Sequence, residues 1–245
     1  MTKRFEFATL RRQLIVVVTT PNRTIFGTSS MPLPTDGVSS APYMPEAEVA
    51  FLISIYKEAK VILEYGSGGT TRIAAGLPGK FIISVESDRE WAQNLQHEID
   101  TSKPASPVIV YHADIGPTGL WGRPISTNSW RHFFRYPLDV WETPFFRHPD
   151  TILIDGRMRT ACLAMIMLRC TKPVTVLFDD YGVRPLYHEI EKLICPSEIV
   201  GRMARFEIEP DTVEKAQLFF AVKQFAMASI DGEGEAFYRR QARPW

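Results

Sequence analysis

Short apolar runs alternate with helix-like amphipathic segments between residues 61 and 194. The runs are rich in β-branched residues and are bounded by glycine, proline or polar residues, which is typical of buried strands. Five strands are expected, at residues 61–64, 81–87, 107–115, 151–155 and 174–180. Helices are expected at residues 45–60, 70–75, 88–99, 158–170 and 184–194. This alternation predicts a Rossmann-like, doubly wound α/β fold, in which a mostly parallel sheet carries helices on both faces.

The last part of the chain departs from this alternation. Residues 202–208 and 216–225 are two apolar segments joined by the turn-like residues 209–215, and no helix pattern separates them. Two strands joined by a short turn run antiparallel. We therefore predict a sheet of about seven strands with an antiparallel strand at one edge.

The first part of the chain follows neither pattern. Residues 13–20 are apolar enough to form an edge strand, and the stretch after them is rich in proline, serine, threonine and glycine, which is typical of an extended arm. We predict an N-terminal extension over residues 1–44. A single domain is expected over residues 45–245, with an insertion at residues 116–149.

Composition narrows the class of protein. The chain has 28 basic and 28 acidic residues, so no excess of charge points to nucleic acid or to an anionic membrane. Its three cysteines form no C-x-x-C pair, which argues against a disulfide framework and against a thiolate zinc site. No apolar run is long enough to span a membrane, and no signal peptide is evident. We expect a cytoplasmic protein, with no nucleic-acid partner and no membrane contact, and the oligomeric state stays open.

Acidic residues stand where the predicted parallel strands end. They are Glu64, Glu86, Asp114, Asp155, Asp179 and Asp180. In a doubly wound sheet, ligands bind beyond the carboxyl ends of the strands, which all lie at one edge. One or two such acids would be explained as helix caps. A complete set predicts a ligand site along that edge.

A glycine-rich turn, "YGSGGTT" at residues 65–71, follows the first of these strands. A phosphate-binding P-loop would need a lysine after the last glycine, and the turn has none. A nicotinamide-binding turn would have a third glycine where Thr71 stands. Glu64, just before the turn, would repel a pyrophosphate and would suit an ammonium group.

The stretch "LEYGSG" resembles the first motif of the class I S-adenosylmethionine-dependent methyltransferases. The stretches "DIGPTGLWGRP", "LIDGRMRTACL" and "LFDDY" resemble a bacterial branch of the same family, and the likeness spans roughly residues 45–225. The resemblance implies a binding site for S-adenosylmethionine. Its residues would be Glu64, Tyr65, Gly66, Ser67, Gly68, Thr70, Glu86, Ser87, Asp114, Ile115 and Asp155.

The same resemblance implies separate roles along the site. The glycine turn would approach the methionine part of the cofactor, with Glu64 beneath it. Glu86 would accept hydrogen bonds from the two ribose hydroxyls, for which a carboxylate is well suited. Asp114 would meet the adenine amino group, with Ile115 beside the ring. The sequence departs from the motif at Thr70, where many members have a third glycine.

Two alternatives to a methyltransferase remain at this point. A nicotinamide- or nucleotide-binding Rossmann-type oxidoreductase would also use an acid such as Glu86 for a ribose. A cofactor-binding module without catalytic activity is the other. For a methyltransferase, we expect transfer of the methyl group to an oxygen of a small molecule or saccharide.

A second acidic group, Asp155, Asp179 and Asp180, follows the fourth and fifth predicted strands. Clustered carboxylates repel one another unless a cation or a proton intervenes, and a magnesium ion prefers such oxygen ligands. The pattern is similar to that of the catechol O-methyltransferase group, which implies a magnesium ion that activates a substrate hydroxyl. Alternatively, Asp155 contacts the cofactor, Asp179 caps the next helix, and Arg157 neutralises Asp155. The catalytic candidates are Asp155, Asp179 and Tyr181.

The insertion at residues 116–149 is rich in aromatic residues. They are Trp121, Trp130, Phe133, Phe134, Tyr136, Trp141, Phe145 and Phe146. A long segment between the elements of a compact domain is usually functional, and aromatic side chains can form the wall of a substrate pocket. We expect at least half of them to pack against the sheet instead. His112 and His188 are weaker candidates for a general base.

Overall fold

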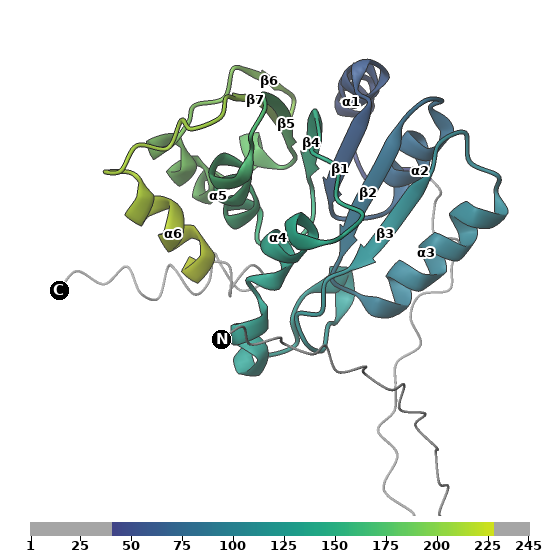
Figure 1. Ribbon diagram of the computed structural model, residues 1–245, viewed down its shortest axis with the longest axis horizontal. Coiled ribbons are helices and arrows are strands. Elements are labelled where there is room, and N and C mark those ends of the chain that lie inside the picture. Colours follow the sequence, from purple (N-terminus) through teal and green to yellow (C-terminus); the bar gives the residue numbers. More distant parts are fainter. Residues whose placement is uncertain (1–40, 228–245) are drawn as a thin grey trace, which may run out of the picture. The chain divides into compact units, whose positions relative to one another are not determined.

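A seven-stranded sheet runs through residues 41–227, the part of the chain that the computed structural model describes (Figure 1). Its strands are β1 (Val61–Tyr65), β2 (Phe81–Glu86), β3 (Val108–His112), β4 (Thr151–Ile154), β5 (Val174–Phe178), β6 (Glu198–Val200) and β7 (Met203–Ile208). They lie in the order β3-β2-β1-β4-β5-β7-β6. The first five are parallel, β7 is antiparallel to β5, and β6 is antiparallel to β7. The predicted fold class is confirmed.

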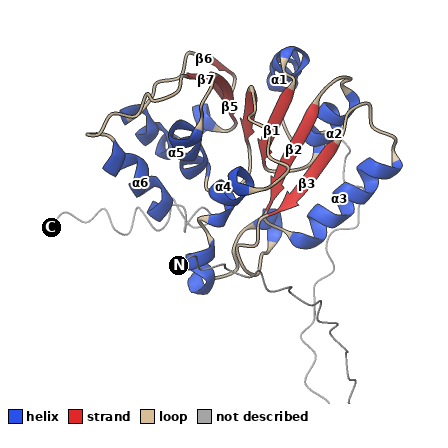
Figure 2. Cartoon of the chain, in the orientation of Figure 1, coloured by secondary structure: helices blue, strands red, loops and turns tan. Residues whose placement is uncertain are grey.

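Helices cover both faces of the sheet (Figure 2). One face carries α1 (Glu46–Glu58), α2 (Gly69–Gly76) and α3 (Arg89–Thr101), and the other carries α4 (Arg135–Leu138) and α5 (Arg159–Arg169). Successive strand residues point to opposite faces, so Ile62 packs with α1–α3 and Leu63 packs with α5. The helix predicted at residues 184–194 is a 3-10 helix over Pro185–Lys192.

The end of the sheet differs from its prediction. Residues 216–225 form no strand: from Leu218 onward they lie in α6 (Leu218–Met227), which packs against α5. Ala221 and Gln224 are both buried, and their spacing of three is helical. The edge of the sheet is formed by β6, which turns into β7 through Gly201, whose φ of +56° suits a tight hairpin.

The insertion is largely built into the core. Phe133, Tyr136 and Trp141 are buried against the sheet, and Phe145 and Phe146 pack beside them, so five of the eight aromatic residues are packed, as expected. The hydroxyl of Tyr65 on β1 donates to the carbonyl of Pro137 at 2.8 Å and accepts from Trp141 Nε1 at 2.7 Å. The other three aromatic residues, Trp121, Trp130 and Phe134, remain exposed.

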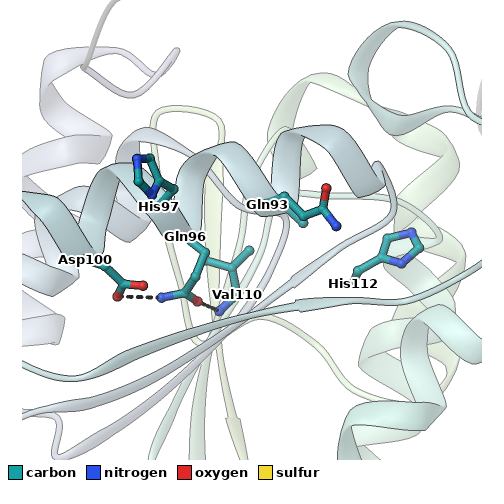
Figure 3. Close-up of a pocket in the computed structure, with 7 residues that line it drawn as sticks. Gln93, Gln96, His97, Asp100, Val110 and His112 are labelled. Carbon is teal, nitrogen blue, oxygen red and sulfur yellow. Dashed lines mark hydrogen bonds between the residues drawn. The ribbon is translucent and has the colours of Figure 1, made fainter. Parts of the chain in front are cut away.

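A side chain of α3 occupies the outer edge of β3. Among residues 41–227, no strand pairs with that edge. Gln96 accepts from the backbone nitrogen of Val110 at 2.7 Å and donates to the carbonyl of Val108 at 3.2 Å. Figure 3 shows the hydrogen bond between Gln96 and Val110, which lies in a groove of about 330 Å³ between α3 and β3. The groove is lined by none of the predicted cofactor residues.

Two of the sequence predictions concern residues that the structure leaves undescribed. The strand predicted at residues 13–20 lies outside the described residues, as does nearly all of the extension predicted over residues 1–44. Within residues 41–227, no helix combines the length and the apolar character that crossing a membrane requires.

Candidate functional site

The glycine turn lies where the strand order reverses, between the ends of β1 and β4. This is the usual ligand position in a doubly wound sheet. Gly66 has a φ of +108°, and a Cβ on it would lie 2.7 Å from the backbone nitrogen of Gly156. A side chain at this position would therefore clash with the loop after β4. The two loops meet backbone to backbone, which leaves their polar groups at the edge of the sheet.

Glu64 lies beneath the turn and supports it. Its carboxylate is fully buried and accepts from the hydroxyls of Tyr56 at 2.8 Å and Thr71 at 2.6 Å. Thr71 Oγ1 in turn accepts from the backbone nitrogen of Gly68 at 3.0 Å. Burial raises the pKa of Glu64, and the hydrogen bonds from Thr71 and Tyr56 partly oppose that rise. The position beneath the turn agrees with the one predicted.

Glu86 at the end of β2 points toward the glycine turn. Its Oε2 accepts from the hydroxyl of Ser67 at 2.7 Å. Its Oε1 accepts from the backbone nitrogens of Ser87 at 2.7 Å and Asp88 at 2.9 Å, which fix the carboxylate. The hydroxyl of Ser87 donates to the carbonyl of Gly122 in the insertion, at 2.8 Å. Thus Ser67, Glu86 and Ser87 are brought together, as the sequence predicted.

The remaining predicted cofactor residues lie in different surroundings. Asp114 is exposed after β3, and the backbone nitrogen of Gly116 donates to it at 3.0 Å, which lowers the pKa of its carboxyl. The side chains of Tyr65, Thr70 and Ile115 are buried. The contact between Ile115 and an adenine ring stays a prediction.

Asp155 and Asp179 lie on neighbouring strands, as predicted, because β4 pairs with β5 and the backbone nitrogen of Asp179 donates to the carbonyl of Ile154 at 3.0 Å. Asp179 is 1% exposed, and Arg202 donates to its two carboxylate oxygens from Nε and Nη2, each at 2.9 Å. Arg202 lies in the turn between β6 and β7.

Two further arginines pair with the other acids of this group. Arg159 Nη2 lies 3.1 Å from Asp155 Oδ1, and Arg159 Nη1 lies 3.2 Å from Asp180 Oδ2. Arg184 Nη2 lies 2.9 Å from the same Asp180 oxygen, and Arg202 Nε lies 3.4 Å from Asp180 Oδ1. Burial and the negative charges of Asp179 and Asp180 together raise the pKa of Asp155 to about 7, although Arg159 opposes the rise. Three carboxylates thus face three guanidinium groups.

This donor set does not fit the predicted magnesium ion. Magnesium takes an octahedron of oxygen ligands about 2.0–2.1 Å away. Here guanidinium nitrogens lie against the carboxylate oxygens of all three acids. Within residues 41–227, no group of three or more histidine, cysteine, aspartate or glutamate residues is arranged to hold a metal ion.

Tyr181, which directly follows Asp180, and His188 are held by partners other than the acidic group. The ring of Tyr181 is buried, and its hydroxyl donates to Glu191 at 2.7 Å; burial and this bond raise its pKa well above the ordinary value. His188 contacts the carbonyl of Tyr181 at 3.0 Å, and His112 lines the groove between α3 and β3. A catalytic role for Tyr181 stays a prediction.

Arg159 and Arg202 are the residues that sequence reasoning missed. One alternative from the sequence gave Asp155 the nearby Arg157 as its partner, and the structure pairs Asp155 with Arg159. The spacing of four between Asp155 and Arg159 was an available signal. The sequence offers no local signal for Arg202, because it reaches Asp179 through the antiparallel pairing of β7 with β5.

Two exposed aromatic side chains meet above the glycine turn. Tyr43, just before α1, is 86% exposed, and Trp121 in the insertion is 70% exposed; their ring centroids lie 6.1 Å apart. Trp121 has a left-handed backbone (φ 62°, ψ 28°), which is uncommon for a bulky residue. A Cβ on Gly122 would lie 3.0 Å from Glu86 Oε1, so this loop is in contact with the acid at the end of β2.

The backbone before α1 is held over the same edge. A Cβ on Gly69 would lie 2.3 Å from the backbone nitrogen of Pro42, so the two backbones touch. Arg202 Nη2 donates to the carbonyl of Tyr43 at 2.9 Å. The pair Tyr43 and Trp121 is therefore anchored to the glycine turn, to β2 and to the acidic group.

The fold is that of the class I S-adenosylmethionine-dependent methyltransferases, and a solved relative shows the family. The crystal structure of a methyltransferase-like protein from Silicibacter pomeroyi is 43% identical in sequence, with a TM-score of 0.72. The match covers 76% of this chain and 98% of that chain. The chain belongs to this methyltransferase family, which confirms the methyltransferase prediction over the oxidoreductase alternative.

Two other solved structures match at low identity. An S-adenosylmethionine-dependent O-methyltransferase from Thermotoga maritima is 10% identical, with a TM-score of 0.45, over 68% of this chain and 66% of that chain. An RNA methyltransferase from Salinibacter ruber, solved with S-adenosyl-L-homocysteine, is 13% identical, with a TM-score of 0.43, over 70% and 96%. No protein-family model matches the chain. No curated protein matches it either.

Proposed function

We propose that this methyltransferase transfers the methyl group of S-adenosylmethionine to a hydroxyl oxygen of a small molecule or saccharide. The observation that carries the proposal is one arrangement: the glycine turn, Glu86 and Asp155 lie at the ends of the adjacent strands β1, β2 and β4. When bound, the cofactor supplies a methyl group on a positively charged sulfur, which an oxygen nucleophile can attack.

The chain's own groups fit the two ends of this cofactor. Glu86 Oε1 is fixed by two backbone nitrogens, and Oε2 is held by a serine hydroxyl that a ribose hydroxyl can replace. The turn at Gly66 and the partly exposed Asp155 lie on either side of the point where the strand order reverses. Asp155 supplies a negative charge near the expected amino-acid end of the cofactor.

Asp155 is also the group placed to take a proton from the acceptor. Its side chain is 32% exposed, whereas Asp179 is 1% exposed and bound on both oxygens by Arg202. When a hydroxyl acceptor is methylated and gives up its proton, the carboxylate of Asp155 would take that proton. A hydroxyl acceptor is favoured because it needs such a base.

The acceptor would bind under Tyr43 and Trp121. Their rings are exposed and lie next to each other near the glycine turn. A flat or apolar surface of the acceptor that packs on these rings would remove both from water. A saccharide ring satisfies this as well as an aromatic ring does, because both present a C–H or π face.

Calorimetry tests the cofactor, and labelled methyl transfer tests the reaction. S-adenosylmethionine and S-adenosylhomocysteine should bind with a stoichiometry of one, and NAD should not bind. Methyl-labelled cofactor should then label members of a panel of hydroxyl compounds and saccharides. Binding of NAD without binding of S-adenosylmethionine would overturn the proposal. The cytoplasmic location and the lack of a nucleic-acid partner stay predictions.

A further inference from the structure

Three acids at the ends of β4 and β5 carry a negative charge that must be balanced. Asp179 and Asp180 are buried, and Asp155 is partly exposed. Carboxylates this close repel one another, and burial makes the repulsion stronger because water screens it less. The group therefore needs a proton or a cation beside it, and the buried Asp179 and Asp180 favour a cation.

The structure supplies that cation from its own side chains. Arg202 binds both oxygens of Asp179, in the parallel two-bond geometry that a guanidinium group makes best with a carboxylate. It also donates to the carbonyl of Tyr43, and its backbone nitrogen donates to Glu48 Oε1 at 2.9 Å. Arg202 is thus fixed from three directions.

Arg159 is fixed even more firmly. It is 4% exposed and donates to the carbonyls of Gly156 and Asp155 at 3.1 Å, and to that of Asp179 at 2.5 Å. These contacts are made in addition to its ion pairs with Asp155 and Asp180. A side chain with this many partners cannot leave without breaking the ends of both strands.

We infer that Arg159 and Arg202 take the place of a divalent metal ion, and that they hold Asp155 and Asp179 in position without one. Arg202 pairs with the buried Asp179, and the buried Arg159 pairs with the partly exposed Asp155. The contact between Asp155 and a methyl acceptor rests on the function proposed above. The inference that no metal ion is needed is independent of that function.

Titration with Mn²⁺, followed by electron paramagnetic resonance on the full chain, tests the inference without methyl transfer. The wild-type chain should bind no Mn²⁺ more tightly than about 1 mM, the weak end of protein sites for divalent ions. A stoichiometric Mn²⁺ site that Asp179→Asn removes would overturn the inference. Failure of S-adenosylmethionine to bind would instead refute the proposed function and leave this titration unchanged.

Removing the guanidinium should create the metal site. Arg202→Met leaves Asp179 and Asp180 without that partner, so it should bind Mn²⁺ at least about tenfold more tightly than wild type, and Mn²⁺ should raise its Tm. Arg205→Met is the matched control, because Arg205 lies three residues further along, in β7, and pairs with the exposed acids Glu198 and Glu207. A folded Arg202→Met chain that responds to Mn²⁺ no more than this control would contradict the inference. If Arg202→Met does not fold, the Mn²⁺ titrations of the wild-type chain and of Asp179→Asn test the inference.

Discussion

Arg202 holds Asp179 with two hydrogen bonds of 2.9 Å, one from Nε and one from Nη2. The two residues come from opposite strand ends, because β7 runs antiparallel to β5. Asp179 is buried, so its charge depends on this partner. Replacing one member of a buried ion pair leaves the other charge without compensation.

We predict that Arg202→Ala lowers the free energy of unfolding by about 3–5 kcal/mol. Arg205→Ala on β7 should lower it by about 1 kcal/mol or less, because the partners of Arg205 are half-exposed glutamates. Urea denaturation of both variants gives the comparison. Equal losses in the two variants would show that Asp179 is not stabilised by this pair.

Glu86→Ala should weaken binding of S-adenosylmethionine by about 1.5–3 kcal/mol, the range for hydrogen bonds to a charged group. The physical reason is the loss of the carboxylate that the two backbone nitrogens hold toward the turn. Glu90→Ala is the control, because Glu90 is an exposed acid in the first turn of α3, four residues after Glu86. Calorimetry on both variants measures the difference, and an unchanged affinity for Glu86→Ala would remove this residue from the site.

The sequence was sufficient for the parts of the site that depend on local order. An apolar run that ends in an acid and a glycine turn places Glu64 and Gly66 at a strand end, whatever the rest of the chain does. Glu86 was found in the same way. The pairing of β4 with β5 followed from the alternation, and with it the closeness of Asp155 and Asp179.

Distant contacts account for what could not be predicted. The partner of Asp179 is fixed by a hairpin at Gly201, and residues 216–225 are apolar enough to suit either a strand or a helix. Packing against α5 stabilises the helical form, α6. Likewise, Trp141 and Trp121 belong to the same aromatic insertion, yet one packs beneath β1 and the other stays exposed.

Gln96→Ala should lower the free energy of unfolding by about 1–2 kcal/mol, since it removes two hydrogen bonds to the edge of β3. Gln93→Ala is a matched control on the same helix, because Gln93 lines the same groove and is exposed. We expect its effect to stay within about 0.5 kcal/mol. Hydrogen exchange at the backbone nitrogen of Val110 should accelerate in the Gln96 variant alone. No acceleration there would show that this nitrogen is protected by something other than the glutamine.

Trp121→Ala should raise KM for the acceptor and leave the affinity for S-adenosylmethionine and the stability nearly unchanged. Trp121 is 70% exposed, so the fold loses little packing with it. Trp141→Ala is the contrasting variant: its buried ring packs in the core, and its loss should cost about 3–5 kcal/mol of stability. Steady-state kinetics with a hydroxyl acceptor that proves active would show the difference. An unchanged KM would place the acceptor away from Tyr43 and Trp121.

The raised pKa of Asp155 makes a prediction about stability as a function of pH. Its value rises from 3.8 to about 7 on folding, so between these limits the folded chain binds more protons at this group than the unfolded chain does. The free energy of unfolding contributed by Asp155 therefore falls as the pH rises from about 4 to 7. Asp155→Asn removes the ionisable group and with it this dependence of the unfolding free energy on pH.

The unfolding free energy of Asp155→Asn minus that of wild type should thus increase from pH 4 to pH 7 and then level off. Asp114→Asn is a control of opposite sign, because the pKa of Asp114 is lowered on folding by the backbone nitrogen of Gly116. For Asp114, stability is gained as the pH rises toward 3.8, so its difference should fall with pH below that value and stay flat from pH 5 to 7. Urea denaturation at several pH values measures both curves. A flat difference for Asp155→Asn between pH 4 and 7 would mean that Asp155 stays ionised in the folded chain, so that Arg159 outweighs the burial and the charges of Asp179 and Asp180.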